Sequence, residues 1–160
     1  MLLAIDPGNV MSAYVMVEED TYRPVMFGKV ENDKLLSIVK EYTNHQTPAI
    51  IEMVASYGMA VGKDVFDTCV WIGRYTQAAI DAGACVDNIY RSEEKMNLCH
   101  RQNARDSNIR QALVDRFATH DFKSGKGTKK SPDFFYGFAK DVWAAFAVAV
   151  TYIDKRKMEG

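Results

Sequence analysis

Residues 2–17 read LLAIDPGNVMSAYVMV, two apolar runs separated by a short polar turn. The first run ends on Asp6, and the Pro7-Gly8 pair directly after it is a strong turn signal. A third apolar run follows at residues 24–30, after another polar turn. Because consecutive strands joined by short turns usually pair with each other, the pattern predicts a three-stranded antiparallel meander. Asp6 is expected at the end of the first strand of this meander.

The rest of the chain alternates between helix and strand patterns. The expected elements are a helix at 32–42 capped by Asn32, a buried strand at 49–54, a helix at 62–82, a strand at 84–90, a short helix capped by Ser92, a helix at 107–118 and a final helix at 140–155. Strands separated by a helix are expected to be parallel, since a crossover connection joins them. Residues 120–137 carry four lysines and no apolar periodicity, which predicts a long loop that is functional or mobile. The chain is therefore expected to be an α/β protein.

Composition limits the classes of protein that remain. A chain of 160 residues that is 48% hydrophobic is expected to form one domain, residues 1–160. No run of about 18 apolar residues and no basic, apolar leader is present, so we expect a cytoplasmic protein with no membrane partner. The three cysteines lack C-x-x-C spacing and are expected to pack in the core rather than form disulfides or a zinc site. The net charge of −1 gives no evidence of nucleic-acid binding, so any basic surface must be local.

Three carboxylates stand where the predicted core should be apolar. Asp6 ends a strand, Glu52 interrupts a buried strand, and Asp141 begins an alanine-rich helix. Clustered carboxylates repel one another unless a hard cation such as Mg²⁺ or Mn²⁺ offsets their charge, so one metal site would account for all three. Two such ions about 3.5–4 Å apart can clamp a scissile phosphate. These residues therefore predict phosphodiester hydrolysis.

Two of the carboxylates also have ordinary structural interpretations. Asp6 before Pro-Gly can be a turn former, and Asp141 can cap or begin the last helix. Glu52 is harder to explain in this way, because burying a charge without a partner is costly. The metal site has the advantage of explaining all three positions at once.

Four segments of the sequence resemble the RuvC family of Holliday junction resolvases. AIDPGNVMSAYVMVE (residues 4–18) resembles the opening of that family, in which an Asp-x-Gly turn joins the first two strands and the aspartate binds metal. AIIEMVASYGMAVGKDVFDTCVWIGRYTQAA (49–79) is similar to the glutamate-bearing strand and the following helix, with its glycine at Gly73. NARDSNIRQALVDRF (103–117) and KDVWAAFAVAVTY (140–152) resemble the last two helices. The overall likeness is to the phage and prophage branch.

The resemblance implies an RNase H-like fold: a five-stranded mixed sheet, antiparallel in strands 1–3 and parallel in strands 4 and 5, flanked by helices on both faces. It implies a metal-dependent, structure-selective DNA endonuclease that resolves four-way junctions or other branched DNA. Asp6, Glu52 and Asp141 would be catalytic and would bind two Mg²⁺ or Mn²⁺ ions. The family usually acts as a homodimer, whose two-fold symmetry matches that of a junction. A phage-encoded member would work in the host cytoplasm.

One departure from the family concerns its last helix, which commonly offers an acid or histidine and then an aspartate three residues later. Here Asp141 fits the first position and Ala144 occupies the second. Ala144 is compatible with a natural departure and with an engineered, inactivating change. Asp106 is the candidate replacement ligand, with a helix N-cap as its alternative role. The departure also favours two alternative functions: a weak or inactive module that binds branched DNA, or a nuclease for flaps and forks.

DNA phosphates would have to be bound by local basic clusters, because the chain is nearly neutral. The candidate DNA-binding residues are Lys63, Arg91, Lys95, Arg101, Arg105, Lys123, Lys126, Lys129 and Lys130, together with Tyr57 as an inserting or stacking residue. A solvated helix face and loop is the alternative for the basic residues, and a loop packed on the sheet is the alternative for Tyr57. Phe134 and Phe135 are expected to anchor the long loop to the core rather than stack on bases.

The helix at 62–82 is the candidate dimer interface. Phe66, Val70, Trp71 and Tyr75 lie along it at helical spacing. The alternative is that all four residues face the sheet.

Overall fold

A computed structural model describes residues 1–160 of the protein. Its elements are β1 (Leu2–Asp6), β2 (Met11–Val17), β3 (Pro24–Glu31), α1 (Asn32–Tyr42), β4 (Ala49–Met53), α2 (Lys63–Asp81), β5 (Val86–Tyr90), α3 (Arg91–Cys99), α4 (Asp106–Phe117) and α5 (Lys140–Glu159). The five strands form one sheet in the order β3-β2-β1-β4-β5. β2 is antiparallel to β1 and β3, whereas β4 is parallel to β1 and β5. The predicted five-stranded mixed sheet is confirmed.

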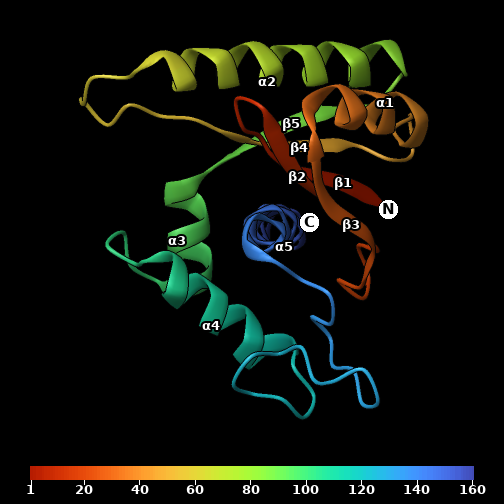
Figure 1. The fold of residues 1–160 in the computed structure, drawn as a ribbon, viewed down its shortest axis with the longest axis vertical. Coiled ribbons are helices and arrows are strands. Elements are labelled where there is room, and N and C mark those ends of the chain that lie inside the picture. The colour runs from red at the N-terminus through yellow and green to blue at the C-terminus, as the bar shows by residue number, and fades with distance from the viewer.

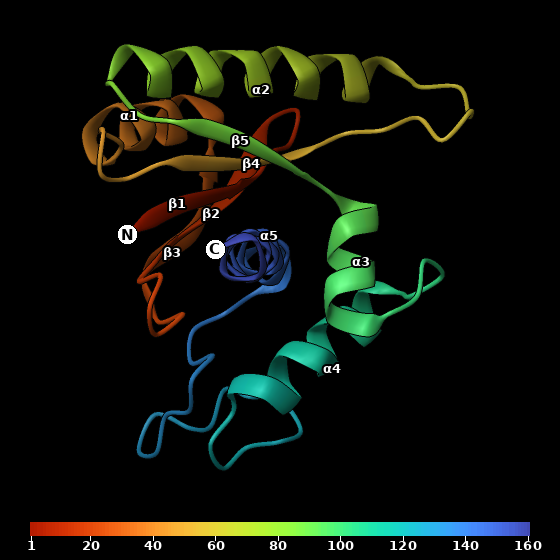
Figure 2. The ribbon, with the colours of Figure 1, turned by 180° about the vertical axis from the view of Figure 1, so that it is seen from behind.

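Helices cover both faces of this sheet. Figure 1 shows α1 and α2 on one side of the strands and α5 on the other, with α3 beside α5 and α4 beyond it. The same layers appear from behind in Figure 2. Two apolar clusters fill the spaces between them, one joining the sheet to α1 and α2, the other joining it to α4 and α5. No helix is long and apolar enough to cross a membrane.

The apolar runs that predicted the central strands are explained by burial on both faces. Leu2, Leu3, Ala4 and Ile5 of β1 are all fully buried, since neighbouring side chains point alternately toward α5 and toward α2. In α5 the alanines at positions 145, 147 and 149 are also fully buried. Their small side chains let α5 pack closely on β1 and β2, which brings the start of α5 near the ends of the strands.

A buried hydrogen-bond network fixes the turn after β1. The Ser12 hydroxyl accepts a hydrogen bond from the Gly8 amide at 3.0 Å and donates to Asn32 Oδ1 at 2.7 Å, and the Tyr75 hydroxyl lies 3.1 Å from it. The Asn32 amide group donates to the Gly8 carbonyl at 2.9 Å. A Cβ atom on Gly8 would lie 2.1 Å from the Met11 carbonyl oxygen, so only glycine fits there. The network holds the backbone beside Asp6.

The loop at residues 120–137 has no helix or strand, as predicted. Its shape comes from internal hydrogen bonds, because the Asp133 carboxylate accepts from the backbone amides of Thr119, His120 and Asp121 at 2.7–3.1 Å. These amides hold the pKa of Asp133 well below its usual range, against the opposing effect of burial. Phe135 is fully buried and Phe134 packs against the same core, which confirms that the aromatic pair anchors the loop.

Three predictions about local structure are wrong. Ser92 does not cap α3, because the helix begins at Arg91 and its N-cap is Tyr90, so Ser92 is its second residue. Cys69 and Cys85 are exposed and Cys99 is only half-buried, so the cysteines are not core residues. Cys69 lies on the outer face of α2, and composition alone does not tell which face of a helix a residue occupies. Asn32 is the first residue of α1 rather than its cap, because its side chain is used to hold the Gly8 carbonyl.

Candidate metal centre

Asp6 and Glu52 lie side by side at the carboxyl ends of two adjacent parallel strands. The register of β1 and β4 pairs Ile5 with Ile51, so the next residue along each strand is the acid. Neighbouring strands are about 4.8 Å apart, and residues in register point to the same face of a sheet. The fold therefore brings together two carboxylates that are separated by 45 other residues in the sequence, positions 7 to 51.

The surroundings of Asp6 favour its neutral form. Burial raises the pKa of the Asp6 carboxyl far above its usual range, and the neighbouring carboxylates Glu52 and Asp141 raise it further. Arg91 has the opposite effect but does not offset them. An opposite charge close to the pair would restore the ionised form. The carboxyl groups around Asp6 therefore have too little positive charge near them to keep Asp6 ionised.

Asp141 lies in the first turn of α5 and is paired with a lysine. The Lys29 ammonium on β3 donates to Asp141 Oδ2 at the half-exposed rim of the site. As they stand, no three His, Cys, Asp or Glu side chains converge closely enough to hold a metal ion. The donor chemistry still fits a hard cation, since Asp6 and Glu52 are adjacent carboxylates in need of a counter-charge. Asp141 would have to turn away from Lys29 to join them.

A fourth carboxylate, Glu94 of α3, was not predicted from the sequence. Its side chain is 0% exposed, and its Oε2 accepts a hydrogen bond from Arg91 Nη1 at 2.6 Å. Burial and the neighbouring Glu52 raise the pKa of Glu94 well above its usual range, although Arg91 lowers it. The sequence does hold one indication of its position. Glu94 lies three residues after Arg91 and four before Leu98, so the three side chains share one face of the short helix, and this face points inward.

Arg91 connects the acids of this centre. Nη1 bonds Glu94 and lies 3.9 Å from Glu52 Oε1, while Nη2 pairs with Asp106. Arg91 is the first residue of α3, directly after β5, and this position turns its guanidinium toward the ends of the parallel strands. The residue predicted to contact DNA thus faces carboxylates. Asp106, the candidate replacement ligand, has a side chain that is 87% exposed, and Arg91 is its partner.

Comparison with known proteins shows a relationship in structure. No protein-family model matches the sequence, and no curated protein matches it. The solved structure of Thermus thermophilus RuvC has a TM-score of 0.72 at 17% sequence identity, and the alignment covers 99% of this chain and 96% of that one. T. thermophilus RuvC in complex with a Holliday junction substrate has a TM-score of 0.71 at 16% identity, covering 99% and 95%. The protein has a RuvC-like fold.

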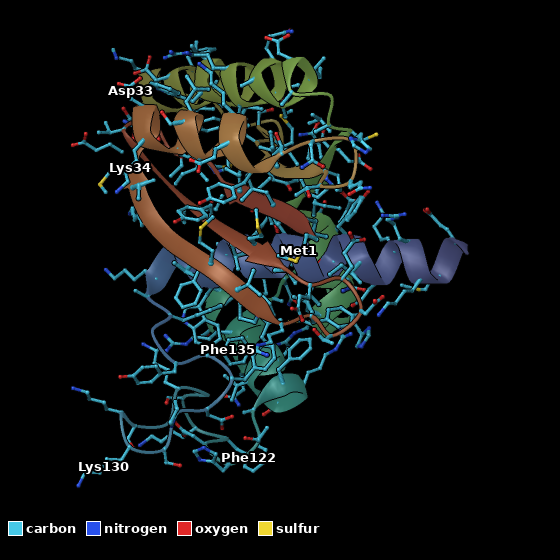
Figure 3. All side chains as sticks on the ribbon, turned by 90° about the vertical axis from the view of Figure 1, so that its right-hand side faces the viewer. Met1, Asp33, Lys34, Phe122, Lys130 and Phe135 are labelled. Atoms are coloured by element: carbon cyan, nitrogen blue, oxygen red, sulfur yellow. The ribbon has the colours of Figure 1, made fainter.

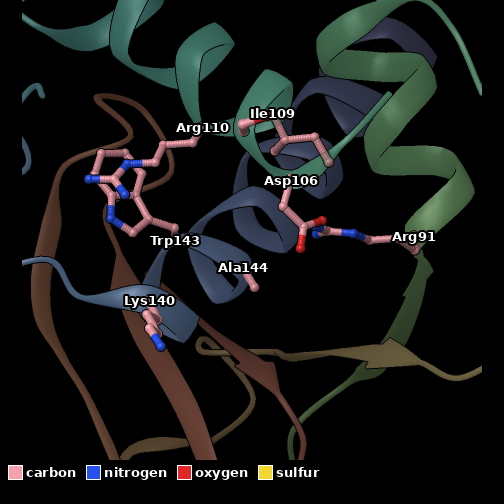
Figure 4. A pocket seen from close by; sticks show the side chains of 8 residues that line it. Arg91, Asp106, Ile109, Arg110, Lys140, Trp143 and Ala144 are labelled. Carbon is pink, nitrogen blue, oxygen red and sulfur yellow. The ribbon is translucent and has the colours of Figure 1, made fainter. Parts of the chain in front are cut away.

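A pocket of about 380 Å³ opens beside the acids of this RuvC-like fold, between α3, α4 and α5. Its lining residues are Arg91, Asp106, Ser107, Ile109, Arg110, Lys140, Trp143 and Ala144. Figure 4 shows the Arg91 and Asp106 side chains facing each other, with the Ala144 methyl group directed into the same space. The Arg110 guanidinium lies 4.6 Å from the centre of the Trp143 ring. Arg110 and Lys140 are cations of the pocket that were not among the predicted DNA-binding residues.

Some of the predicted DNA-binding residues project from the carboxyl-end side of the sheet. Tyr57 is 68% exposed, in the loop between β4 and α2, and its φ of 50° is in the left-handed region. Figures 1 and 2 show this loop and the link between α3 and α4 extending to the same side of the molecule. Arg101 and Arg105 lie in that link and are exposed. Lys63, at the start of α2, is exposed and pairs with Asp67, whereas Lys95 is half-buried.

The remaining predicted lysines lie elsewhere. Figure 3 shows Asp33 and Lys34 of α1 at one end of the molecule and Lys130 at the opposite end. Lys123 and Lys129 are exposed on the same loop, and Lys126 is half-buried. The RuvC-like fold therefore carries its candidate cations in two separate regions.

Proposed function

We propose that this protein is a metal-dependent endonuclease that cuts branched DNA, four-way junctions in particular. The observation that carries the proposal is the adjacent pair Asp6 and Glu52, two carboxyl groups that lie side by side at the carboxyl ends of two parallel strands. The RuvC-like fold supports it, since one solved neighbour is named as a complex with a Holliday junction substrate. The substrate class comes from that likeness, and the chemistry comes from the carboxylates.

Asp6, Glu52 and Asp141 would hold the metal, with Asp106 as a further candidate. Two Mg²⁺ or Mn²⁺ ions bound there would supply an activated water and would stabilise the leaving oxygen of the phosphodiester. Asp6 and Glu52 are already adjacent. Asp141 would break its ion pair with Lys29 and bind the metal ion instead. In the bound state Lys29 would be free to contact a phosphate oxygen of the DNA.

The DNA would lie across the carboxyl ends of the strands and the pocket beside α4. Arg110 and Lys140 offer positive charge within the pocket, and Arg101 and Arg105 extend it along the link between α3 and α4. Contacts of this kind neutralise phosphates without reading base sequence. Tyr57, which is 68% exposed, would stack on an opened base at the branch point. Lys126, Lys129 and Lys130 would contact an arm of the DNA further from the cut.

The proposed assembly is a homodimer formed through the outer face of α2. Phe66 and Val70 on that face are 61% and 62% exposed, and Gly73 has no heavy atom within 4 Å of an added Cβ. A glycine there lets a second helix approach closely. Tyr75 is buried and Trp71 is half-buried, so these two of the four candidate residues face inward. Exposed aromatic and aliphatic groups in one patch are typical of protein interfaces.

The test is a cleavage assay on four-way junctions, flaps, forks and RNA–DNA hybrids measured side by side. We expect the natural sequence to cut the four-way junction fastest in Mg²⁺ or Mn²⁺. Asp6→Asn and Glu52→Gln are expected to lose nearly all activity while still binding the junction. Unchanged cleavage by both variants would rule out the metal assignment, and faster cleavage of flaps or forks would change the substrate.

A second candidate function is a module that binds branched DNA without cutting it. Two observations favour it: Ala144 leaves no acid at that position of α5, and Lys29 already occupies Asp141. Calorimetric titration with Mn²⁺ separates the two functions. Absence of metal uptake, together with tight binding of a junction that stays intact, would favour the binding module.

A further inference from the structure

One oxygen of the buried acid Glu94 has no partner. Oε2 is bonded to Arg91, but Oε1 is inaccessible to solvent and accepts no hydrogen bond. A buried charged oxygen without a partner costs free energy, so such an atom needs an explanation. The loop and helix around it offer none, because no backbone amide or hydroxyl group reaches it.

Glu94 belongs to the same group of acids as Asp6 and Glu52. Its carboxyl group lies against that of Glu52, which in turn lies against Asp6. Three acids thus form a continuous row from β1 through β4 to α3. Two facing carboxyl groups are stable only if they share a proton or a cation lies between them.

Arg91 does not provide enough positive charge for this row. Its guanidinium divides its hydrogen bonds between Glu94 and Asp106 and lies 3.9 Å from Glu52. One positive charge therefore faces three carboxylates. None of these hydrogen bonds goes to Glu94 Oε1, which is left buried without a partner.

The start of α5 supplies only one acid to the centre, whereas the row of Asp6, Glu52 and Glu94 supplies three. Asp141 is its only acid near the centre, and Ala144, one turn later, ends in a methyl group beside Arg91 and Asp106. A carboxylate is thus missing from α5 and present, buried, on α3.

We propose that Glu94 is a fourth carboxylate ligand of the metal centre, supplied by α3 at a centre where α5 carries Ala144. This inference rests on the proposed metal-dependent function and names one more residue of the same site. Oε1 gives up no partner when a metal binds, since it has none. Arg91 keeps Asp106 as its partner when Glu94 turns to the ion.

Mn²⁺ binding measured by calorimetry, with no DNA present, tests the assignment. We expect two Mn²⁺ ions per chain for the natural sequence. Glu94→Gln is expected to lose one of them, or to bind it at least about tenfold more weakly, a loss of the size seen when groups around a metal are removed. The matched control is Asp115→Asn, which removes one exposed acid of α4 whose hydrogen bond comes from Gln111.

A purely structural role for Glu94, in holding Arg91, predicts a different pattern. If Glu94 is a ligand, Arg91→Gln removes a competing cation and strengthens Mn²⁺ binding, so the two variants change the affinity in opposite directions. If Glu94 acts only through Arg91, both variants change it in the same direction. Weakening by both variants, or a Glu94→Gln isotherm equal to that of Asp115→Asn, would overturn the assignment.

Two further measurements keep the outcome clear. Glu94→Asp keeps the charge and replaces the Gln variant if that one does not fold: weaker Mn²⁺ binding supports the ligand, and unchanged binding overturns it. Asp6→Asn separates this inference from the proposed function. If the natural sequence binds no Mn²⁺, the function itself fails. If Asp6→Asn abolishes binding and Glu94→Gln does not change it, only the role of Glu94 fails.

Discussion

The Lys29 ammonium donates directly to Asp141 Oδ2, so a lysine from β3 neutralises the one acid that α5 contributes to the centre. Both side chains are nearly half exposed. The pair joins residues 112 positions apart and ties the edge of the sheet to the start of α5. A metal that needs Asp141 therefore has to compete with Lys29 for it.

Lys29→Gln is accordingly expected to strengthen Mn²⁺ binding. An exposed ion pair of this kind is worth at most about 1 kcal/mol, so the gain in affinity should be no more than about fivefold. Calorimetry of the DNA-free protein measures it, with Lys34→Gln on the exposed face of α1 as the control. Equal affinities for the two variants would mean that Asp141 takes no part in metal binding.

Thermal stability without metal should depend on pH in an unusual direction. Because the pKa of Asp6 is raised in the folded protein, the folded state binds more protons than the unfolded state above the unfolded pKa. The free energy of unfolding therefore falls as pH rises through that window. We expect the melting temperature in EDTA to fall between roughly pH 5 and pH 8.

The comparison uses Mn²⁺ and Asp6→Asn. Excess Mn²⁺ should remove most of the fall, because the cation replaces the proton, and Asp6→Asn should make the fall in EDTA smaller. Glu94 contributes in the same direction, since its pKa is also raised. A melting temperature in EDTA that rises steadily over this range would contradict the electrostatic account of the centre.

Gly8→Ala is expected to damage both stability and metal binding. The new methyl group would lie 2.1 Å from the Met11 carbonyl oxygen, so the turn that follows Asp6 would have to move. Forcing a group into such a contact costs about 1–3 kcal/mol, which lowers the melting temperature of a chain of this size by roughly 3–10 °C. Gly62→Ala is the control for stability, because its added methyl group meets nothing within 4 Å and its φ of −94° is ordinary for alanine. A stable Gly8→Ala variant with unchanged Mn²⁺ affinity would show that the turn does not position Asp6.

The dimer interface can be tested with a single charge on α2. Phe66→Glu places a carboxylate in the exposed apolar patch and should convert a dimer to a monomer in sedimentation measurements, with the melting temperature of the monomer unchanged. Phe122→Glu is the matched control, since Phe122 is exposed to a similar extent on the distant loop. A Phe66→Glu variant that still sediments as a dimer would exclude this face.

Local patterns were sufficient to predict most of the sheet and two of the site residues. Asp6 and Glu52 stand out because each interrupts or ends an apolar run, and the parallel register that brings them together follows from the order of the elements. Glu94 was missed for a physical reason: the burial of its side chain is decided by the packing of α3 against α4, α5 and β5, which no local pattern contains. The ion pair between Lys29 and Asp141 was missed for the same reason, because the two residues are 112 positions apart in the sequence.

The link between α3 and α4 should contribute to DNA affinity without contributing to chemistry. Arg101 and Arg105 are exposed there, on the same side of the molecule as the loop that carries Tyr57. Each phosphate contact contributes about 0.9 to the slope of log K against log salt, so Arg101→Ala with Arg105→Ala should weaken junction binding and reduce that slope by about 1–2. Lys34→Ala with Lys40→Ala on α1 removes the same charge from an exposed surface and is the control. Since a phosphate contact is independent of base sequence, the loss should be equal for junctions of different sequence. Equal slopes for the two double variants would exclude this link from the DNA interface.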